Sequence, residues 1–314
     1  MLVRMTVILF AGLTLLSAAP SRAEDWRLVW SDEFNGQSLD RSKWNLDVDC
    51  WGGGNGERQC YTASSRNAAV VDGKLVITAL RQHATGPALP KDQRQNASDP
   101  NAEVSREFTS ARLTTRGKAA WRFGRVEVRG RLPQGQGLWP AIWMLPERDV
   151  YGPWASSGEI DILEAVNLGV ACASCVGGRE DTILGTLHFG KPWPNNVHSG
   201  TEIHFPEGLE GFHTYAIDWD ADRIVWQVDG RTYAERKSSQ WWSSGSPVTG
   251  APFDQPFHLI LNLAVGGGLA ESRGLKGVST KDFPKRFEIE WIRIWQKDSN
   301  STNSPSGPAV AGSR

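Results

Sequence analysis

The sequence lacks long amphipathic helical patterns and has little methionine, little cysteine and little net charge. Its 314 residues include 3 Met, 4 Cys, 34 basic and 35 acidic side chains, which gives a formal charge of −1. A nearly neutral chain has no electrostatic attraction to nucleic acid or to an anionic membrane surface. We therefore expect no nucleic-acid partner and no binding to a charged membrane.

An apolar run long enough to span a bilayer is also missing. Val7 to Ala19 is nearly all apolar but is too short to cross comfortably, and no later stretch is long enough. Arg4 before this run and Ser21-Arg22-Ala23 after it complete the pattern of a secretory signal. We expect residues 1–23 to be removed, which takes two positive charges from the formal −1 and leaves −3. The sequence thus predicts a secreted or periplasmic protein without a membrane span.

Glycine and tryptophan are abundant, with 33 and 15 residues, and the chain is dominated by short alternating runs between turn residues. Phe108–Thr115, Phe123–Leu132 and Phe287–Gln296 are such runs. The pattern predicts an all-β fold, a two-sheet antiparallel β-sandwich formed by one domain over residues 24–297. The segment 298–314 is rich in Ser, Asn, Pro and Gly, which is typical of a disordered tail.

The four cysteines are Cys50, Cys60, Cys172 and Cys175. An even number in an exported chain favours two disulfides. Pairing within each close pair is the simplest arrangement, although three connectivities exist. Cys172 and Cys175 also have the spacing of a redox motif or of half a zinc site. The thioredoxin-like context or the two further ligands that those interpretations need are not evident.

Three carboxylates lie in the run Ser157-Gly158-Glu159-Ile160-Asp161-Ile162-Leu163-Glu164-Ala165. In a regular strand Glu159 and Asp161 share one face and Glu164 lies on the other. One extra residue between Asp161 and Glu164, a β-bulge, returns Glu164 to the face of its partners. The two glutamates are then about 13 Å apart at Cα, from four steps of ~3.3 Å. Long side chains can close most of that gap toward the roughly 5–5.5 Å of retaining glycosidases.

The alternative is three solvated acids on an exposed strand edge. Like charges crowded on one strand face repel each other, so this arrangement is costly for a purely structural strand. The cost is understandable if the repulsion separates the pKa values of the carboxyls for catalysis. We therefore interpret the run as a catalytic strand.

Aromatic residues precede the acidic strand in Leu138–Leu145, where Trp139 and Trp143 share one face. They could be ordinary core residues, but flat indoles also stack on the apolar faces of pyranose sugars, and beside the acids we favour a sugar platform. His188, followed by Trp193, is either structural or lines the same cleft. Asn262 interrupts an apolar strand and is either a core hydrogen-bonding residue or a ligand contact.

A glycine-rich loop joins Cys50 to Cys60. It lacks the Lys-Ser/Thr ending of a phosphate-binding loop. Asn55 and Glu57 within it are suited to hydrogen bonds with sugar hydroxyls. We expect this loop to shape one part of the cleft, with its ends held by the cysteines.

Together these motifs resemble glycoside hydrolase family 16 in its bulged form. The segments that carry the likeness run in order from about residue 26 to residue 296 and are Asn55–Gln59, Leu138–Leu145, Gly158–Glu164, Gly185–Gly190, Phe253–Phe257 and Leu261–Gly267. Within the family the chain is most similar to the laminarinase-type endo-β-1,3-glucanases. The resemblance implies a concanavalin A-like β-jelly roll with a concave substrate cleft.

The resemblance also implies roles for single residues. Glu159 would be the nucleophile, Glu164 the acid/base and Asp161 the residue that tunes the pair. Trp139, Trp143 and His188 would line the cleft. We also expect Asn55, Glu57, Trp193 and Asn262 to contact the substrate. The chemistry requires no cofactor. Family members often hold a structural calcium, and its positions here are Glu33, Gly73 and Glu290, the last of which is usually Asp.

The implied activity is hydrolysis of internal β-1,3-glucosidic bonds of laminarin-like β-glucan, with retention, by a monomer. Other substrates stay open: mixed-linkage β-1,3-1,4-glucan, or a marine galactan as for agarases and carrageenases. Transglycosylation and a non-catalytic β-glucan-binding role are further alternatives. The residues expected in the cleft are tryptophans and acids, whereas a sulfated polymer would favour a basic cleft, so the sequence favours a neutral glucan.

Overall fold

The computed structural model describes residues 26–273 and 275–297. The predicted signal at 1–23 and the predicted tail at 298–314 lie outside the described residues. The compact unit that contains both large sheets is Arg27–Gln296. No helix formed by the described residues is long and apolar enough to cross a membrane.

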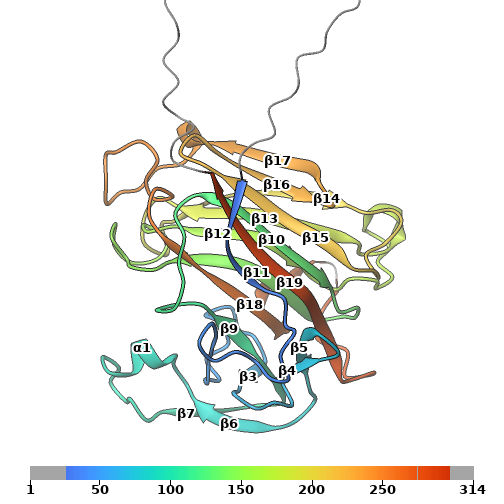
Figure 1. Cartoon of the computed structure of the whole chain (residues 1–314). Coiled ribbons are helices and arrows are strands. Elements are labelled where there is room, and N and C mark those ends of the chain that lie inside the picture. Colours follow the sequence, from blue (N-terminus) through green and yellow to red (C-terminus); the bar gives the residue numbers. More distant parts are fainter. Residues whose placement is uncertain (1–25, 274, 298–314) are drawn as a thin grey trace, which may run out of the picture. The chain divides into compact units, whose positions relative to one another are not determined.

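Two large antiparallel sheets make up this unit (Figure 1). The eight-stranded back sheet has the order β17 (Arg231–Lys237), β16 (Arg223–Val228), β15 (His213–Trp219), β10 (Gly124–Arg131), β19 (Lys285–Lys297), β5 (Lys74–Ala79) and β4 (Ala68–Val71), with β1 (Trp26–Asp32) also paired to β19. The seven-stranded front sheet has the order β14 (Val197–His204), β13 (Thr182–Phe189), β12 (Glu159–Ala165), β11 (Leu138–Pro146), β18 (Phe257–Val265), β9 (Arg112–Thr114) and β2 (Asn45–Leu46).

Smaller elements complete the unit. Two further pairs of strands are β3 (Gln59–Tyr61) with β8 (Phe108–Ser110), and β6 (Ala84–Pro87) with β7 (Glu103–Arg106). The helices are short: α1 (Lys91–Arg94), α2 (Gly268–Ser272) and the 3₁₀ turns Val176–Gly178 and Ser238–Gln240. The prediction of an all-β, two-sheet antiparallel sandwich is confirmed.

The core lies between the two sheets. Strand β10 alternates buried and partly exposed residues, so that Val126 and Val128 point inward. The front sheet contributes Ile160 and Leu187 to the same cluster, and the back sheet Ile292. Alternation with period 2 thus places the apolar side chains of each strand in the core and leaves the other face of the front sheet for polar groups.

Strand β12 contains the predicted bulge. Asp161 faces Thr186 of β13 and Glu164 faces Leu184, so the two residues between the acids face the single residue Gly185. The pairing with β11 shifts at the same place. The prediction that an extra residue brings Glu164 into line with the other acids is confirmed.

Both predicted disulfides are formed, and both join near neighbours in sequence. Cys50 bonds to Cys60 and Cys172 bonds to Cys175. Of the three connectivities open from sequence, the structure has the pairing within each close pair.

Candidate active site

The register of the front sheet arranges the three acids in successive rows on its outer face, which we call the active face. Residues directly opposite each other on antiparallel strands point to the same side. Glu159 faces His188, Asp161 faces both Thr186 and Trp143, and Glu164 faces both Leu184 and Ala141. The row of Glu164 continues outward to Glu202 on β14 in one direction and to Asn262 and Arg112 in the other.

Glu159 is held from two sides. The indole Nε1 of Trp154 donates a 2.7 Å hydrogen bond to its Oε2. His188 Nε2 lies 3.8 Å from its Oε1. The side chain is only 14% exposed, so the two oxygens have different neighbours in a largely dry setting.

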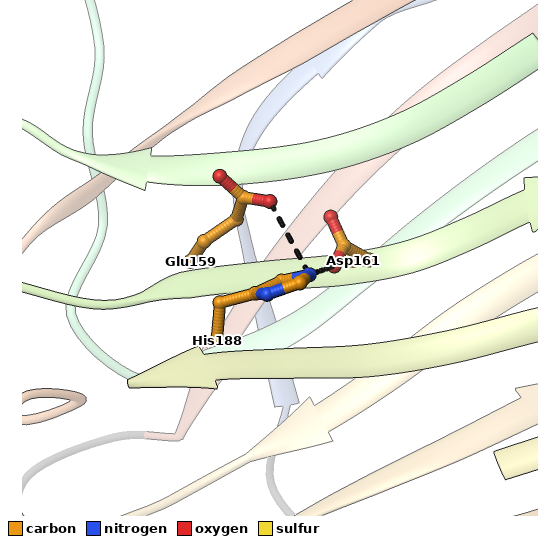
Figure 2. Close-up of side chains that lie close together, drawn as sticks. All are labelled: Glu159, Asp161 and His188. Atoms are coloured by element: carbon orange, nitrogen blue, oxygen red, sulfur yellow. Dashed lines mark ion pairs between the residues drawn. The ribbon is translucent and has the colours of Figure 1, made fainter. Parts of the chain in front are cut away.

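Asp161 lies deeper than Glu159, with 2% of the residue exposed. His188 Nε2 is 3.4 Å from its Oδ2. Figure 2 shows the imidazole of His188, which comes from β13, beside the carboxyls that β12 presents. One histidine therefore contacts two neighbouring acids of the catalytic strand.

Glu164 has a tryptophan of its own. Trp139 Nε1 donates a 3.0 Å hydrogen bond to Glu164 Oε1. Each glutamate thus accepts a hydrogen bond from a different indole, and the shorter of the two goes to Glu159.

Burial of the acids raises the pKa of all three carboxyls far above their ordinary values. The negative charge of Asp161 raises the pKa of Glu159 and Glu164 further, while the positive charge available at His188 and the indole hydrogen bonds act in the opposite direction. Three neighbouring buried carboxyls cannot all be ionised near neutral pH. The cluster therefore retains a proton that it can give to a leaving group.

Trp143 and Asn262 contact each other beside the acids. Trp143 Nε1 donates a 2.7 Å hydrogen bond to Asn262 Oδ1. Asn262 is 6% exposed, so its amide oxygen is satisfied within the protein. Both residues lie on the active face, but the Asn262 oxygen already accepts a hydrogen bond from Trp143.

Asn55 and Glu57 lie close to Trp139. Glu57 is buried and accepts hydrogen bonds from Asn55 and Gln59. A Cβ at Gly267 would lie 3.0 Å from Glu57 Cγ and 3.2 Å from Trp139 Cζ3, and Gly267 has a φ of +93°. This glycine thus gives the cysteine-flanked loop room to approach the side of the active face that carries Trp139.

Trp193 lies beyond the opposite end of the acidic strand. Its side chain is 73% exposed, and its main-chain N–H donates to the carbonyl of Trp154 at 3.1 Å. Trp154 itself lies 5.5 Å from His188, measured between ring centroids. Trp193 is therefore connected to the site through Trp154 and not through a contact with the acids.

Sequence reasoning missed two parts of the site. Trp154 lies in an irregular loop with no period, and only its place five residues before Glu159 hinted at a contact. Arg273 pairs with Glu202 through two hydrogen bonds of 2.8 Å, and its charge lowers the pKa of Glu164. These residues are far apart in sequence, so no local motif indicates the pair.

The residues expected to bind calcium do not fit that role. Glu33 accepts two hydrogen bonds of 2.9 Å from Arg293, and Glu290 accepts one of 2.8 Å from Arg129. Gly73 could contribute only its main-chain carbonyl oxygen. In the part of the chain that the structure describes, the one group of three or more acidic, His or Cys residues close enough to share an ion includes none of these. Calcium prefers six to eight oxygen ligands, whereas both carboxylates here are neutralised by arginine.

Comparisons with known proteins agree with this geometry. The model of the family described as Glycosyl hydrolases family 16 matches residues 58–293. A glucan endo-1,3-beta-glucosidase A1 from Niallia circulans is 40% identical over 282 residues, which are 86% of this chain and 38% of that protein. A beta-glucanase from Rhodothermus marinus is 39% identical over 292 residues, 91% of each chain.

A solved structure is similar over nearly its whole length. The laminarinase from Rhodothermus marinus superposes with a TM-score of 0.70 at 39% sequence identity, covering 88% of this chain and 99% of that one. Since the family match covers most of the chain and includes the bulged acidic strand, the chain belongs to glycosyl hydrolase family 16.

Proposed function

We propose that this chain is a retaining endo-β-1,3-glucanase in which Glu159 is the nucleophile and Glu164 the acid/base. The observation that carries the proposal is the bulge in β12, which puts both glutamates and Asp161 on one face. Double displacement requires two carboxyls that flank the scissile bond, and one face of the sheet can present both of them to a substrate lying across it. The different indole partners of the two glutamates support a division of roles.

In the first step Glu164 donates its proton to the glycosidic oxygen as the bond to the leaving sugar breaks. Ionised Glu159 attacks the anomeric carbon and forms a covalent glycosyl-enzyme. In the second step Glu164 takes a proton from water, whose oxygen attacks the anomeric carbon and releases Glu159. Net retention at the anomeric carbon results from the two inversions.

Asp161 and His188 support this sequence without contacting the leaving group. Burial is the main cause that raises the pKa of Glu164, and negative charge on Asp161 raises it further, so the acid keeps its proton. When Glu159 becomes an ester, the cluster loses one negative charge and the pKa of Glu164 falls. Glu164 then loses its proton more readily and is suited to act as a base.

β-1,3-Glucan is the substrate that the comparisons support, since similar proteins carry the names glucan endo-1,3-beta-glucosidase and laminarinase. Trp139 and Trp143 are half-buried on the active face and can stack on glucosyl rings. We place Asn55, Glu57, His188, Trp193 and Asn262 among the residues that shape the binding region. Mixed-linkage glucan, a galactan and transglycosylation are not favoured by these names.

The proposal extends to the working form of the protein. We propose a monomer that needs no cofactor for the chemistry and that acts outside the cytoplasm, in the medium or the periplasm. The two disulfides support an oxidising compartment. Calcium is left out of the proposal because arginine occupies both expected carboxylates.

The test is a product profile with laminarin, lichenan and agarose, combined with two isosteric variants. Glu159→Gln and Glu164→Gln should each remove nearly all turnover, while Glu207→Gln, an exposed glutamate in a turn, should leave it unchanged. NMR of the first product should show the β-anomer. Substantial turnover by either catalytic variant, or release of the α-anomer, would contradict the assignment.

A further inference from the structure

The contact between His188 and the acids of β12 has a second chemical meaning. Glu159, Asp161 and His188 each present one ligand atom, and the three atoms lie within 4.8 Å of one another. No other set of three His, Cys, Asp or Glu residues within 26–273 and 275–297 meets that condition. Figure 2 shows the two carboxyls and the imidazole converging from neighbouring strands.

The two distances from His188 are close to those around a small tetrahedral cation, and the two carboxylate oxygens lie within 4.8 Å of each other. His188 Nε2 is 3.4 Å from Asp161 Oδ2 and 3.8 Å from Glu159 Oε1. Ligands bound at about 2.0–2.1 Å in a tetrahedron are about 3.3–3.4 Å apart. One of the two distances is already at that value, and the other needs only a small movement of the flexible Glu159 side chain.

Asp161 Oδ2 gives an independent reason to expect a ligand. Asp161 is 2% exposed, and its Oδ2 accepts no hydrogen bond from any described residue. A buried carboxylate oxygen without a donor is costly. A cation among the three residues would satisfy this oxygen and would balance the two carboxylate charges with its own two positive charges.

We propose that Glu159, Asp161 and His188 form a binding site for a divalent cation of the zinc class, and that this cation inhibits the enzyme. Carboxylate oxygens and imidazole nitrogens are both ligands of zinc, and a site with three protein ligands leaves the fourth position for water. The fourth position would be open to solvent on the active face, where the side chains of His188 and Glu159 are 24% and 14% exposed. Calcium and magnesium prefer more oxygen ligands, and the imidazole disfavours them.

Inhibition follows from which atom the cation occupies. Trp154 already binds Glu159 Oε2, so the cation takes Oε1. Glu159 then has no free oxygen with which to attack the anomeric carbon. Binding of the cation depends only on the three side chains, whereas its effect on turnover rests on the function proposed above.

The affinity should be lower than that of a structural zinc site. Histidines that bind metals usually donate their other ring nitrogen to a nearby acceptor, and loss of that partner weakens binding about 10–100-fold. His188 Nδ1 is buried and has no hydrogen-bond partner among the described residues. The cation should therefore be removable by a chelator.

The experiment measures binding of Zn²⁺ to the chelator-treated full chain by calorimetry, with Co²⁺ as a spectroscopic probe. We expect one Zn²⁺ per chain, a four-coordinate Co²⁺ spectrum, and no comparable binding of Ca²⁺ or Mg²⁺. His188→Gln and Asp161→Asn should each weaken binding at least about tenfold. The matched control is His83→Gln, which changes an exposed histidine outside the site and should bind as the parent does.

Thermal unfolding without metal checks that each variant is folded. Two different metal-binding residues are replaced, so that one unstable variant does not decide the result. Equal binding by the parent and by both ligand variants, or no binding to the parent, would overturn the proposal. In kinetics, Zn²⁺ should compete with laminarin and EDTA should restore turnover. If Glu159→Gln and Glu164→Gln remain active while Zn²⁺ binds as described, the proposed function fails and the cation site stands.

Discussion

Trp226, on β16 of the back sheet, donates its indole N–H to the main-chain carbonyl of Asp161 at 2.8 Å. A bulge interrupts the ladder of hydrogen bonds, and the back sheet satisfies this carbonyl from across the core. Gly185, opposite the bulge, makes the contact possible, because a Cβ there would lie 2.5 Å from Trp226 Cδ1. The position of the middle acid thus depends on a residue on the far side of the core.

Replacement of Trp226 by Phe should therefore harm both stability and catalysis. The Asp161 carbonyl would remain buried without its donor, at a cost of about 1–3 kcal/mol in the free energy of unfolding. The bulge would lose its support, and kcat should fall on the order of tenfold or more, because small displacements of catalytic groups are costly. Urea unfolding and laminarin kinetics measure the two effects, and KM should change little.

Trp219→Phe is the matched control for that variant. Trp219 is as buried as Trp226, and its indole also donates to a main-chain carbonyl, that of Phe253 at 3.0 Å. The control should lose similar stability and keep its kcat. If both variants lose kcat equally, the effect comes from general destabilisation and not from support of the bulge.

Stability should also depend on pH through Asp161. Burial raises the pKa of this carboxyl from 3.8 to about 8. The native state therefore holds the proton more tightly than the unfolded chain, so the associated stability is complete below about pH 4 and is lost as the pH rises toward 8. Asp161→Asn, which keeps the neutral shape, should flatten the fall of the unfolding temperature between these pH values.

Glu159 and Glu164 contribute in the same direction, so the variant should reduce the slope and not remove it. Glu207→Gln, at an exposed position, should leave the slope as in the parent. An unchanged slope in Asp161→Asn would show that Asp161 is already ionised in the native state. Scanning calorimetry across the pH range gives the result.

The bulge could be predicted from the sequence because it follows from a mismatch between period 2 and the spacing of three acids. The common face of Trp139 and Trp143 could also be predicted, because side chains on a regular strand alternate with period 2. Trp154 and Trp226 could not be predicted, because their contacts depend on a loop conformation and on the packing of one sheet against the other. The arginine partners of Glu33 and Glu290 could not be predicted for a related reason, because they come from neighbouring strands.

Arg273 gives a prediction about the pH profile. Its guanidinium forms two 2.8 Å hydrogen bonds with Glu202, in the same row of the sheet as Glu164, and its charge lowers the pKa of Glu164. Arg273→Gln should therefore let Glu164 keep its proton to higher pH. The alkaline limb of kcat/KM should move upward by roughly a few tenths of a pH unit.

Glu202→Gln provides the opposite change in the same ion pair. It removes the carboxylate that neutralises Arg273, so the positive charge acts on Glu164 with less compensation. The alkaline limb should then move to lower pH. Shifts in the same direction for both variants would indicate a general structural disturbance instead of an electrostatic effect on the acid.

The two disulfides should differ in what they contribute. Cys50–Cys60 spans ten residues and closes the loop that carries Glu57, whereas Cys172–Cys175 spans three. By loop-closure entropy the longer bridge stabilises by about 3 kcal/mol and the shorter by about 2 kcal/mol. Replacing both cysteines of the longer bridge by Ser should also raise KM for laminarin, because the loop beside Trp139 loses its fixed ends. The double Ser variant of the shorter bridge should lower stability and leave KM unchanged. Equal KM values for the two variants and the parent would show that the Cys50–Cys60 loop does not bind glucan.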